Sequence, residues 1–200
     1  MEHSARSAAS AGCFVCVVLA AGASRRFGSQ KLLERIDGVR MIDRALAACG
    51  ARETIVVAAP DLVPAIASND RHRILINAEP ERGMTHSLRL ANAVVDPGAA
   101  LVVLLGDMPY VDLTLLERAI AAFDTTVDLV APSGGDRPAH PVVLGPAARA
   151  RLAALPEGDT LRLLRSDRAL RVRALVFEDA ASQRDVDLPS DLRRPPDSCR

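Results

Sequence analysis

The chain has 200 residues, 49% of them hydrophobic, and its 25 basic residues are balanced by 25 acidic ones. This length is typical of one domain whose core needs no disulfide or metal staple. The balanced charge argues against a nucleic-acid-binding surface, and no apolar run approaches the ~20 residues of a membrane span. We therefore expect a cytoplasmic globular protein that binds neither nucleic acid nor membrane.

Short apolar runs predict buried strands in the first two thirds of the chain. These runs lie at residues 14–20, 54–59, 73–76, 100–105 and 128–131. They lack alternation of apolar and polar residues, as do parallel strands that are covered on both faces. Helical spacing of apolar residues lies between them, at 39–49, from about Gly83 onward and at 112–123. The alternation predicts a three-layer α/β fold with a mostly parallel central sheet.

The last third of the chain is less regular. We expect a strand in "HPVVLG", helices in "PAARARLAAL" and "TLRLLRS", a strand in "LRVRALVF", and a strand turning into a short helix in "QRDVDLPSDL". The N-terminus lacks the long apolar segment of a signal peptide. We expect a single domain over residues 13–192, with flexible tails at 1–12 and 193–200.

The stretch "LAAGASRRFGSQK" follows the first predicted strand and ends at Lys31. Its glycines fit neither the P-loop nor the dinucleotide-binding spacing. Ala20, Ala21 and Gly22 are nevertheless small enough for a ligand to approach the backbone, and Arg26 and Lys31 can neutralise phosphate. Lys31 is the only lysine in the chain. The alternative is a basic turn that only faces solvent.

Asp107 follows the apolar run of "LVVLLGDMPYVD", at the predicted end of a strand. A carboxylate there is well placed to bind Mg²⁺. The alternative is that Asp107 caps the next helix. Asp112 lies nearer to that helix and is the better cap, although Thr114 and Glu117 also have capping-box spacing.

A third acidic group, Asp185 and Asp187, lies in "RDVDLPSD" near the end of the chain. Alternate residues of a strand share a face, so both side chains can point toward one site. If that strand lies beside Asp107, the three carboxylates form a metal site. Clustered carboxylates repel one another unless a cation lies among them. The alternative is a solvated edge.

Six stretches together resemble the MobA-like nucleotidyltransferases, in the order that the family has them. "LAAGASRRFGSQK" is similar to the family's LAAGxSxRxGxxK loop, "NAEPERGMTHSLR" to N…GMxxSL and "LLGDMPYVD" to GDxP. "AHPVVL" resembles the GHP strand, "EGDTLRLL" the GDxGxRxLL helix and "DVDLPSDL" the DIDTPEDL end. The resemblance covers about residues 14–192. Ala139 and His86 depart from it.

The resemblance implies a Rossmann-like nucleotidyltransferase fold and Mg²⁺-dependent transfer of a nucleotide onto a phosphorylated acceptor. The LAAG form of the loop, with Ala21, resembles the cytidylyltransferases that act on molybdopterin cofactor. It therefore implies CTP as donor, molybdopterin as acceptor, and a molybdoenzyme or its chaperone as partner. Three alternatives stay open: a GTP-dependent guanylyltransferase, transfer to a sugar or polyol phosphate, and a non-catalytic protein that handles the cofactor.

The resemblance also implies roles for individual residues. Lys31, Arg26 and Asp107 are the expected catalytic residues, and Asp107, Asp185 and Asp187 the expected Mg²⁺ ligands. The expected nucleotide-binding residues are Leu19, Ala20, Ala21, Gly22, Ser24, Arg26, Lys31, Asn77, Ser87 and Gly106. The expected acceptor-binding residues are His140, Pro141 and Asp159, although a buried structural histidine is the alternative for His140.

Overall fold

The computed structural model describes residues 13–22, 30–66, 71–133, 139–157, 160–177, 185–186 and 191. The strands are β1 (Phe14–Ala20), β2 (Arg35–Ile36), β3 (Val39–Arg40), β4 (Thr54–Ala58), β5 (His72–Ile76), β6 (Ala100–Leu105), β7 (Leu129–Ser133), β8 (Val142–Leu144) and β9 (Val172–Val176). The α-helices are α1 (Met41–Ala48), α2 (Gly83–Asn92), α3 (Leu113–Ala121), α4 (Pro146–Arg151) and α5 (Thr160–Ser166). Short 3₁₀ helices are η1 (Lys31–Leu33), η2 (Val63–Ala65), η3 (Pro80–Arg82) and η4 (Leu152–Ala154).

Seven strands form the central sheet, in the order β5-β4-β1-β6-β8-β7-β9. The pairs among β5, β4, β1 and β6 are parallel, whereas β8 runs antiparallel to both of its neighbours. β1 is an inner strand, where Val17 is paired with Ile55 of β4 and with Val103 of β6. The predicted α/β fold with a mostly parallel sheet is thus confirmed.

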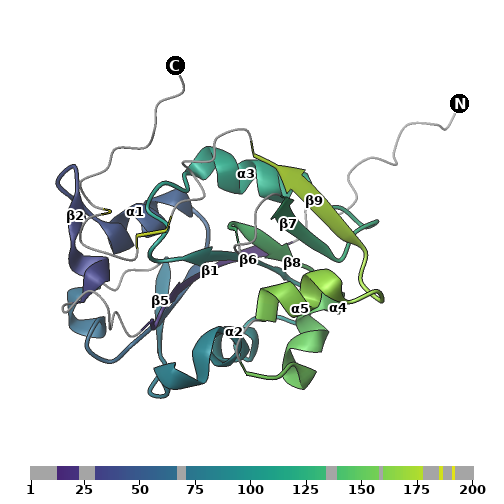
Figure 1. The fold of residues 1–200 in the computed structure, drawn as a ribbon, viewed down its shortest axis with the longest axis horizontal. Helices are drawn as coiled ribbons and strands as arrows, with labels where there is room; N and C mark the ends of the chain where they lie inside the picture. The colour runs from purple at the N-terminus through teal and green to yellow at the C-terminus, as the bar shows by residue number, and fades with distance from the viewer. Residues whose placement is uncertain are drawn as a thin grey trace, which may run out of the picture.

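Helices cover both faces of this sheet, so the molecule has three layers. Figure 1 shows α1 and α3 on one face and α2, α4 and α5 on the other. Successive residues of β1 alternate between the two layers: Val18 belongs to the core cluster on the α1–α3 side, and Val17 to the one on the opposite side. Both side chains are fully buried. This burial on both faces explains why the strand has no polar alternation.

One predicted helix start needs correction. Asp37 and Gly38 both have positive φ, 49° and 80°, and close the two-residue turn between β2 and β3. The helix predicted over 39–49 therefore begins only at Met41, because Val39 and Arg40 pair with β2. The preferred cap of helix α3, Asp112, is confirmed.

The cap of α3 is a hydrogen bond from the backbone N–H of Leu115 to Oδ1 of Asp112, at 2.9 Å. This leaves Asp107 free of that role.

Within the described part of the chain, no helix is long and apolar enough to cross a membrane. The two tails, residues 1–12 and 193–200, lie outside the described residues.

Candidate functional site

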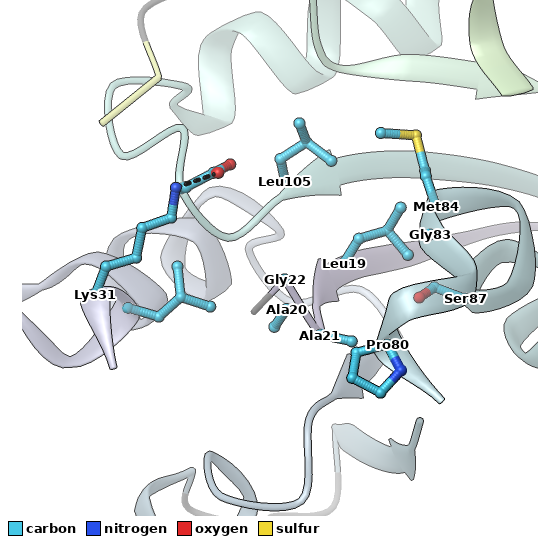
Figure 2. A pocket seen from close by; sticks show the side chains of 12 residues that line it. Leu19, Ala20, Ala21, Gly22, Lys31, Pro80, Gly83, Met84, Ser87 and Leu105 are labelled. Atoms are coloured by element: carbon cyan, nitrogen blue, oxygen red, sulfur yellow. Dashed lines mark hydrogen bonds and ion pairs between the residues drawn. The ribbon is translucent and has the colours of Figure 1, made fainter. Parts of the chain in front are cut away.

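A pocket of about 190 Å³ opens where β1 and β6 end and α2 begins (Figure 2). Among the described residues it is lined by Leu19, Ala20, Ala21, Gly22, Lys31, Leu32, Pro80, Gly83, Met84, Ser87, Leu105 and Asp107. Ligands of open α/β sheets bind beyond the carboxyl ends of the strands. The pocket therefore lies where the sheet topology favours a ligand site.

The turn Leu19–Gly22 lies between Lys31 on one side and the start of α2 on the other (Figure 2). Ala20 and Ala21 line the pocket but are almost fully buried, at 1% and 5% exposed, and their methyl groups take up little of its space. A Cβ added at Gly22 would meet nothing within 4 Å among the described residues. The turn thus leaves room for a ligand to approach its backbone.

Lys31 and Asp107 face each other at one side of the pocket. Nζ of Lys31, at the start of η1, donates to Oδ2 of Asp107 at 2.8 Å. The side chains are 11% and 26% exposed, so the ion pair lies at the pocket edge and is partly screened from water. The residue predicted to neutralise phosphate, Lys31, and the residue predicted to bind the metal, Asp107, are therefore held together.

The segment with Asp185 and Val186 lies against the same pair. The backbone N–H of Val186 donates to the carbonyl oxygen of Asp107 at 3.0 Å, and its own carbonyl accepts from Nζ of Lys31 at 3.0 Å. The structure therefore brings the late acidic segment next to Asp107, as the sequence analysis required. Asp185 and Val186 belong to no strand, so the predicted strand is wrong at these two residues.

Ser87 reaches the pocket from α2, and Asn77 lies behind it. Nδ2 of Asn77 donates to Oγ of Ser87 at 2.9 Å, and Oδ1 of Asn77 accepts from the backbone N–H of Glu79 at 2.9 Å. Asn77 is fully buried and does not line the pocket. Asn77 therefore contacts the pocket only through Ser87 in this structure, and its predicted role in nucleotide binding stays a prediction.

The first turn of α2 forms the wall opposite Lys31. Gly83 starts the helix with a φ of +79°, a conformation that side chains disfavour. The N-cap residue Arg82 directs its side chain to Glu79 and Glu157 and does not cap the helix. Helix N-termini carry unsatisfied N–H groups and partial positive charge, which favour anions. This wall can therefore stabilise a phosphate or a carbonyl oxygen.

His140 and Pro141 do not reach the pocket. Both are buried, and Nδ1 of His140 donates to the carbonyl oxygen of Val103 in β6 at 3.1 Å. Burial lowers the pKa of His140 from 6.5 to about 4, against the opposing effects of the Val103 carbonyl and the charge of Asp107. The expected acceptor contact is corrected, because a neutral, fully covered imidazole has no surface for a ligand.

Gly106 is also absent from the described lining of the pocket. Its N–H donates to the carbonyl oxygen of Leu19 at 2.9 Å, which joins the ends of β6 and β1. A Cβ there would lie 3.1 Å from Cδ1 of Leu32. Gly106 thus allows close packing beneath the site, and its N–H is not available to a nucleotide.

Four of the predicted site residues lie outside the described residues, so their roles stay predictions: Ser24, Arg26, Asp159 and Asp187.

The donor atoms at the pocket suit a hard cation. Asp107 presents a partly exposed carboxylate, and oxygen ligands are those that Mg²⁺ prefers. In the described part of the chain, no three His, Cys, Asp or Glu side chains come close enough to hold a metal ion by themselves. Such a site would draw its remaining ligands from water and nucleotide phosphates, as Mg²⁺ usually does.

Sequence reasoning missed five lining residues: Leu32, Pro80, Gly83, Met84 and Leu105. Pro80, Gly83 and Met84 belong to the quoted "NAEPERGMTHSLR" stretch, and a glycine just before a helix pattern was a usable signal. Leu32 and Leu105 gave no such signal, because apolar residues at such positions are ordinary core.

A mostly parallel α/β sheet with small residues, a lysine and a helix N-terminus at its strand ends is the arrangement that many phosphate-binding α/β proteins use. A family model described as "MobA-like NTP transferase domain" matches residues 16–173. The chain belongs to this family, which confirms the resemblance that the sequence motifs carried.

Relatives agree with this assignment. A probable molybdenum cofactor guanylyltransferase of Bacillus velezensis is 29% identical over 119 residues, which span 59% of this chain and 60% of the relative. The crystal structure of Rv0371c from Mycobacterium tuberculosis has a TM-score of 0.77 and 29% identity, covering 92% of this chain and 97% of that one. A manganese complex of Rv0371c matches with a TM-score of 0.67 and 26% identity, over 82% and 88%.

Proposed function

We propose that the chain transfers the nucleotidyl group of a nucleoside triphosphate to the phosphate of a molybdopterin-type acceptor and releases pyrophosphate. The observation that carries the proposal is the Lys31–Asp107 pair, which lies at the edge of a pocket at the strand ends of a MobA-like fold. A curated relative that matches part of the chain is a probable molybdenum cofactor guanylyltransferase, which supports the acceptor class.

Lys31 has the position to neutralise phosphate oxygens. Its ammonium is a compact point charge on a flexible stem, and it lies across the pocket from the first turn of α2. The triphosphate would lie between these two positive groups, and Lys31 would stabilise the departing pyrophosphate. Arg26 is expected to assist. The Leu19–Gly22 turn and Ser87 would frame the base and ribose.

Asp107 would hold a divalent metal ion, Mg²⁺ in our proposal, with Asp185 and Asp187 as further carboxylates. The ion would neutralise charge on the reacting phosphates. The manganese complex of Rv0371c supports a divalent ion in a similar fold. Asp107 then has two tasks, because it also pairs with Lys31 and so keeps that ammonium at the reaction centre.

The acceptor needs no general base from the protein. A phosphate monoester has a second pKa of about 6 and is largely ionised at neutral pH. Its oxygen attacks the α-phosphorus in line, the α–β phosphoanhydride bond breaks, and pyrophosphate leaves with the electron pair. Catalysis then consists of positioning and charge neutralisation. The burial of His140 agrees with this, because no imidazole is required at the pocket.

The nucleotide is CTP in our proposal, because Ala21 gives the loop the LAAG form of the cytidylyltransferases. GTP is the second candidate, and the guanylyltransferase from Bacillus velezensis favours it. Product formation with CTP and GTP at equal concentration decides between them. Equal or faster turnover with GTP would reject CTP preference and leave nucleotidyl transfer in place.

The activity itself is tested by measuring pyrophosphate release with Mg²⁺, each nucleotide and each acceptor. Pyrophosphate release that occurs with the molybdopterin-type acceptor and with none of the other acceptors supports the proposal. Release only with a sugar or polyol phosphate would move the protein to another acceptor class. Nucleotide or molybdopterin binding without any release would indicate a non-catalytic protein that hands the cofactor to a molybdoenzyme or its chaperone.

A further inference from the structure

Val186 lies where three parts of the site meet, although its side chain carries no chemistry. Its N–H donates to the carbonyl oxygen of Asp107 and its carbonyl accepts from Nζ of Lys31, both at 3.0 Å. Together with the 2.8 Å bond between Lys31 and Asp107, these contacts close a triangle. Lys31 and Val186 are 155 positions apart in the sequence, so the contact is tertiary.

The side chain of Val186 holds this backbone in place. Val186 is 0% exposed and forms a small apolar cluster with Ile36 of β2 and Met41 of α1, against which Tyr110 packs. This cluster is separate from the two large cores that flank the sheet. Because the neighbours come from β2, α1 and the turn before α3, the cluster fixes residue 186 relative to all three.

Lys31 needs such a second anchor. A lysine stem has four carbons and many rotamers, and a single carboxylate contact leaves the ammonium free to swing around it. The Val186 carbonyl adds a second acceptor at a different angle, which restrains Nζ in one position. Precise placement matters, because a misplacement of about 1 Å can cost roughly 100-fold in rate.

We propose that Val186 is a positioning residue that fixes the ammonium of Lys31 and the backbone of Asp107 for nucleotidyl transfer. This inference rests on the proposed function. It assigns Val186 no contact with the nucleotide. Its effect passes through Lys31, whose order can be measured without any turnover.

The test uses Val186→Ala, which removes two methyl groups from the cluster and keeps the backbone. Val130→Ala is the matched control, because Val130 is also fully buried but lies in β7 and lines no part of the pocket. Val186→Ile is the rescue variant, since it restores apolar contact. Thermal unfolding of all three variants establishes that each is folded.

The first readout is NMR of lysine labelled with ¹³C at Cε. Lys31 is the only lysine in the chain, so the spectrum reports this side chain alone. In the wild type we expect two inequivalent Hε protons and a shifted Cε signal, because the ammonium is held. In Val186→Ala we expect a partial collapse toward the values of free lysine, because the bond to Asp107 remains. In Val130→Ala and Val186→Ile we expect the wild-type pattern.

The second readout is turnover. We expect Val186→Ala to lower kcat roughly 10- to 100-fold while KM for the nucleotide changes less than about threefold. A wild-type lysine spectrum in Val186→Ala, or the same collapse in Val130→Ala, would overturn the inference. If Val186→Ala is unfolded, Val186→Thr replaces it under the same criteria. Absence of pyrophosphate release from the wild type would reject only the proposed function, because the lysine spectrum is independent of activity.

Discussion

Lys31 and Asp107 form an ion pair of 2.8 Å between residues that are 76 positions apart in the sequence. The pair places a cation at the acidic group of the site before any metal binds. This adds to the sequence analysis, which expected the three carboxylates to repel one another unless a cation lies among them and did not pair Lys31 with Asp107. Removing that carboxylate leaves the largely buried ammonium of Lys31 without this partner.

Asp107→Asn should therefore abolish turnover and also lower stability. We expect a loss of about 1–3 kcal/mol in the free energy of unfolding, because a hydrogen bond between two charged groups is replaced by a weaker one. Urea unfolding and pyrophosphate release measure the two effects. Asp112→Asn is the matched control, because asparagine is an equally good N-cap and should leave both unchanged. Unchanged or increased stability of Asp107→Asn would contradict the ion pair.

Lys31→Arg should fold and lose turnover, although the chain uses arginine for its other 24 basic residues. A planar guanidinium cannot occupy the place of one compact ammonium between the Asp107 carboxylate and the Val186 carbonyl. Steady-state kinetics at saturating nucleotide measure the effect. Arg151→Lys, at a half-exposed side chain, controls for the reverse exchange and should behave as wild type. Wild-type kcat in Lys31→Arg would show that turnover does not depend on a compact ammonium at residue 31.

Asn77→Ala should weaken nucleotide binding through Ser87. The variant removes the bond to Oγ of Ser87 and leaves the N–H of Glu79 unpaired. We expect KM for the nucleotide to rise and stability to fall by about 1–3 kcal/mol. The double variant Asn77→Ala/Ser87→Ala should have the KM of Ser87→Ala alone, since Asn77 acts through Ser87. Additive effects on KM would contradict this relation.

The free energy of unfolding should decrease as the pH is lowered from about 6.5 to about 4. In this range a histidine of the unfolded chain is protonated, whereas His140 in the folded protein is not. The pKa of His140 is lowered from 6.5 to about 4, so its contribution is complete above about pH 6.5 and is lost as the pH falls toward 4. The slope is about 1.4 kcal/mol per pH unit for one proton. Urea unfolding at about pH 7.5 and about pH 5 should show this loss, and His140→Asn should show less of it. An equal loss of stability in the wild type and in His140→Asn would show that groups other than His140 cause the pH dependence.

The first two thirds of the fold could be predicted because its strands are buried on both faces. Val15 to Ala20 form a continuous apolar run, which identifies a central parallel strand without any tertiary information. The β2–β3 hairpin was missed, although Asp37 and Gly38 form a typical turn dipeptide. The helical spacing beyond it extended the predicted helix too far toward the N-terminus.

The candidate site was predictable only where a residue has a charged side chain in a recognisable local pattern. Lys31 and Asp107 were identified because a lone lysine and a carboxylate follow apolar strands. Val186 was not, because its role is carried by its backbone and by a tertiary cluster. Arg149 shows the same limit: it is 4% exposed and binds the carbonyl oxygens of Asp96 and Ala99, which no local pattern reveals.

The central claim is that a nucleoside triphosphate binds at the Lys31–Asp107 pair with a divalent metal on Asp107. A crystal structure of the chain with Mg²⁺ and CTP that is non-hydrolysable between its α and β phosphates tests this directly. We predict a metal ion about 2.1 Å from a carboxylate oxygen of Asp107, with the phosphates between Lys31 and the first turn of α2. A nucleotide bound outside this pocket, or a metal ion that Asp107 does not ligate, would contradict the account.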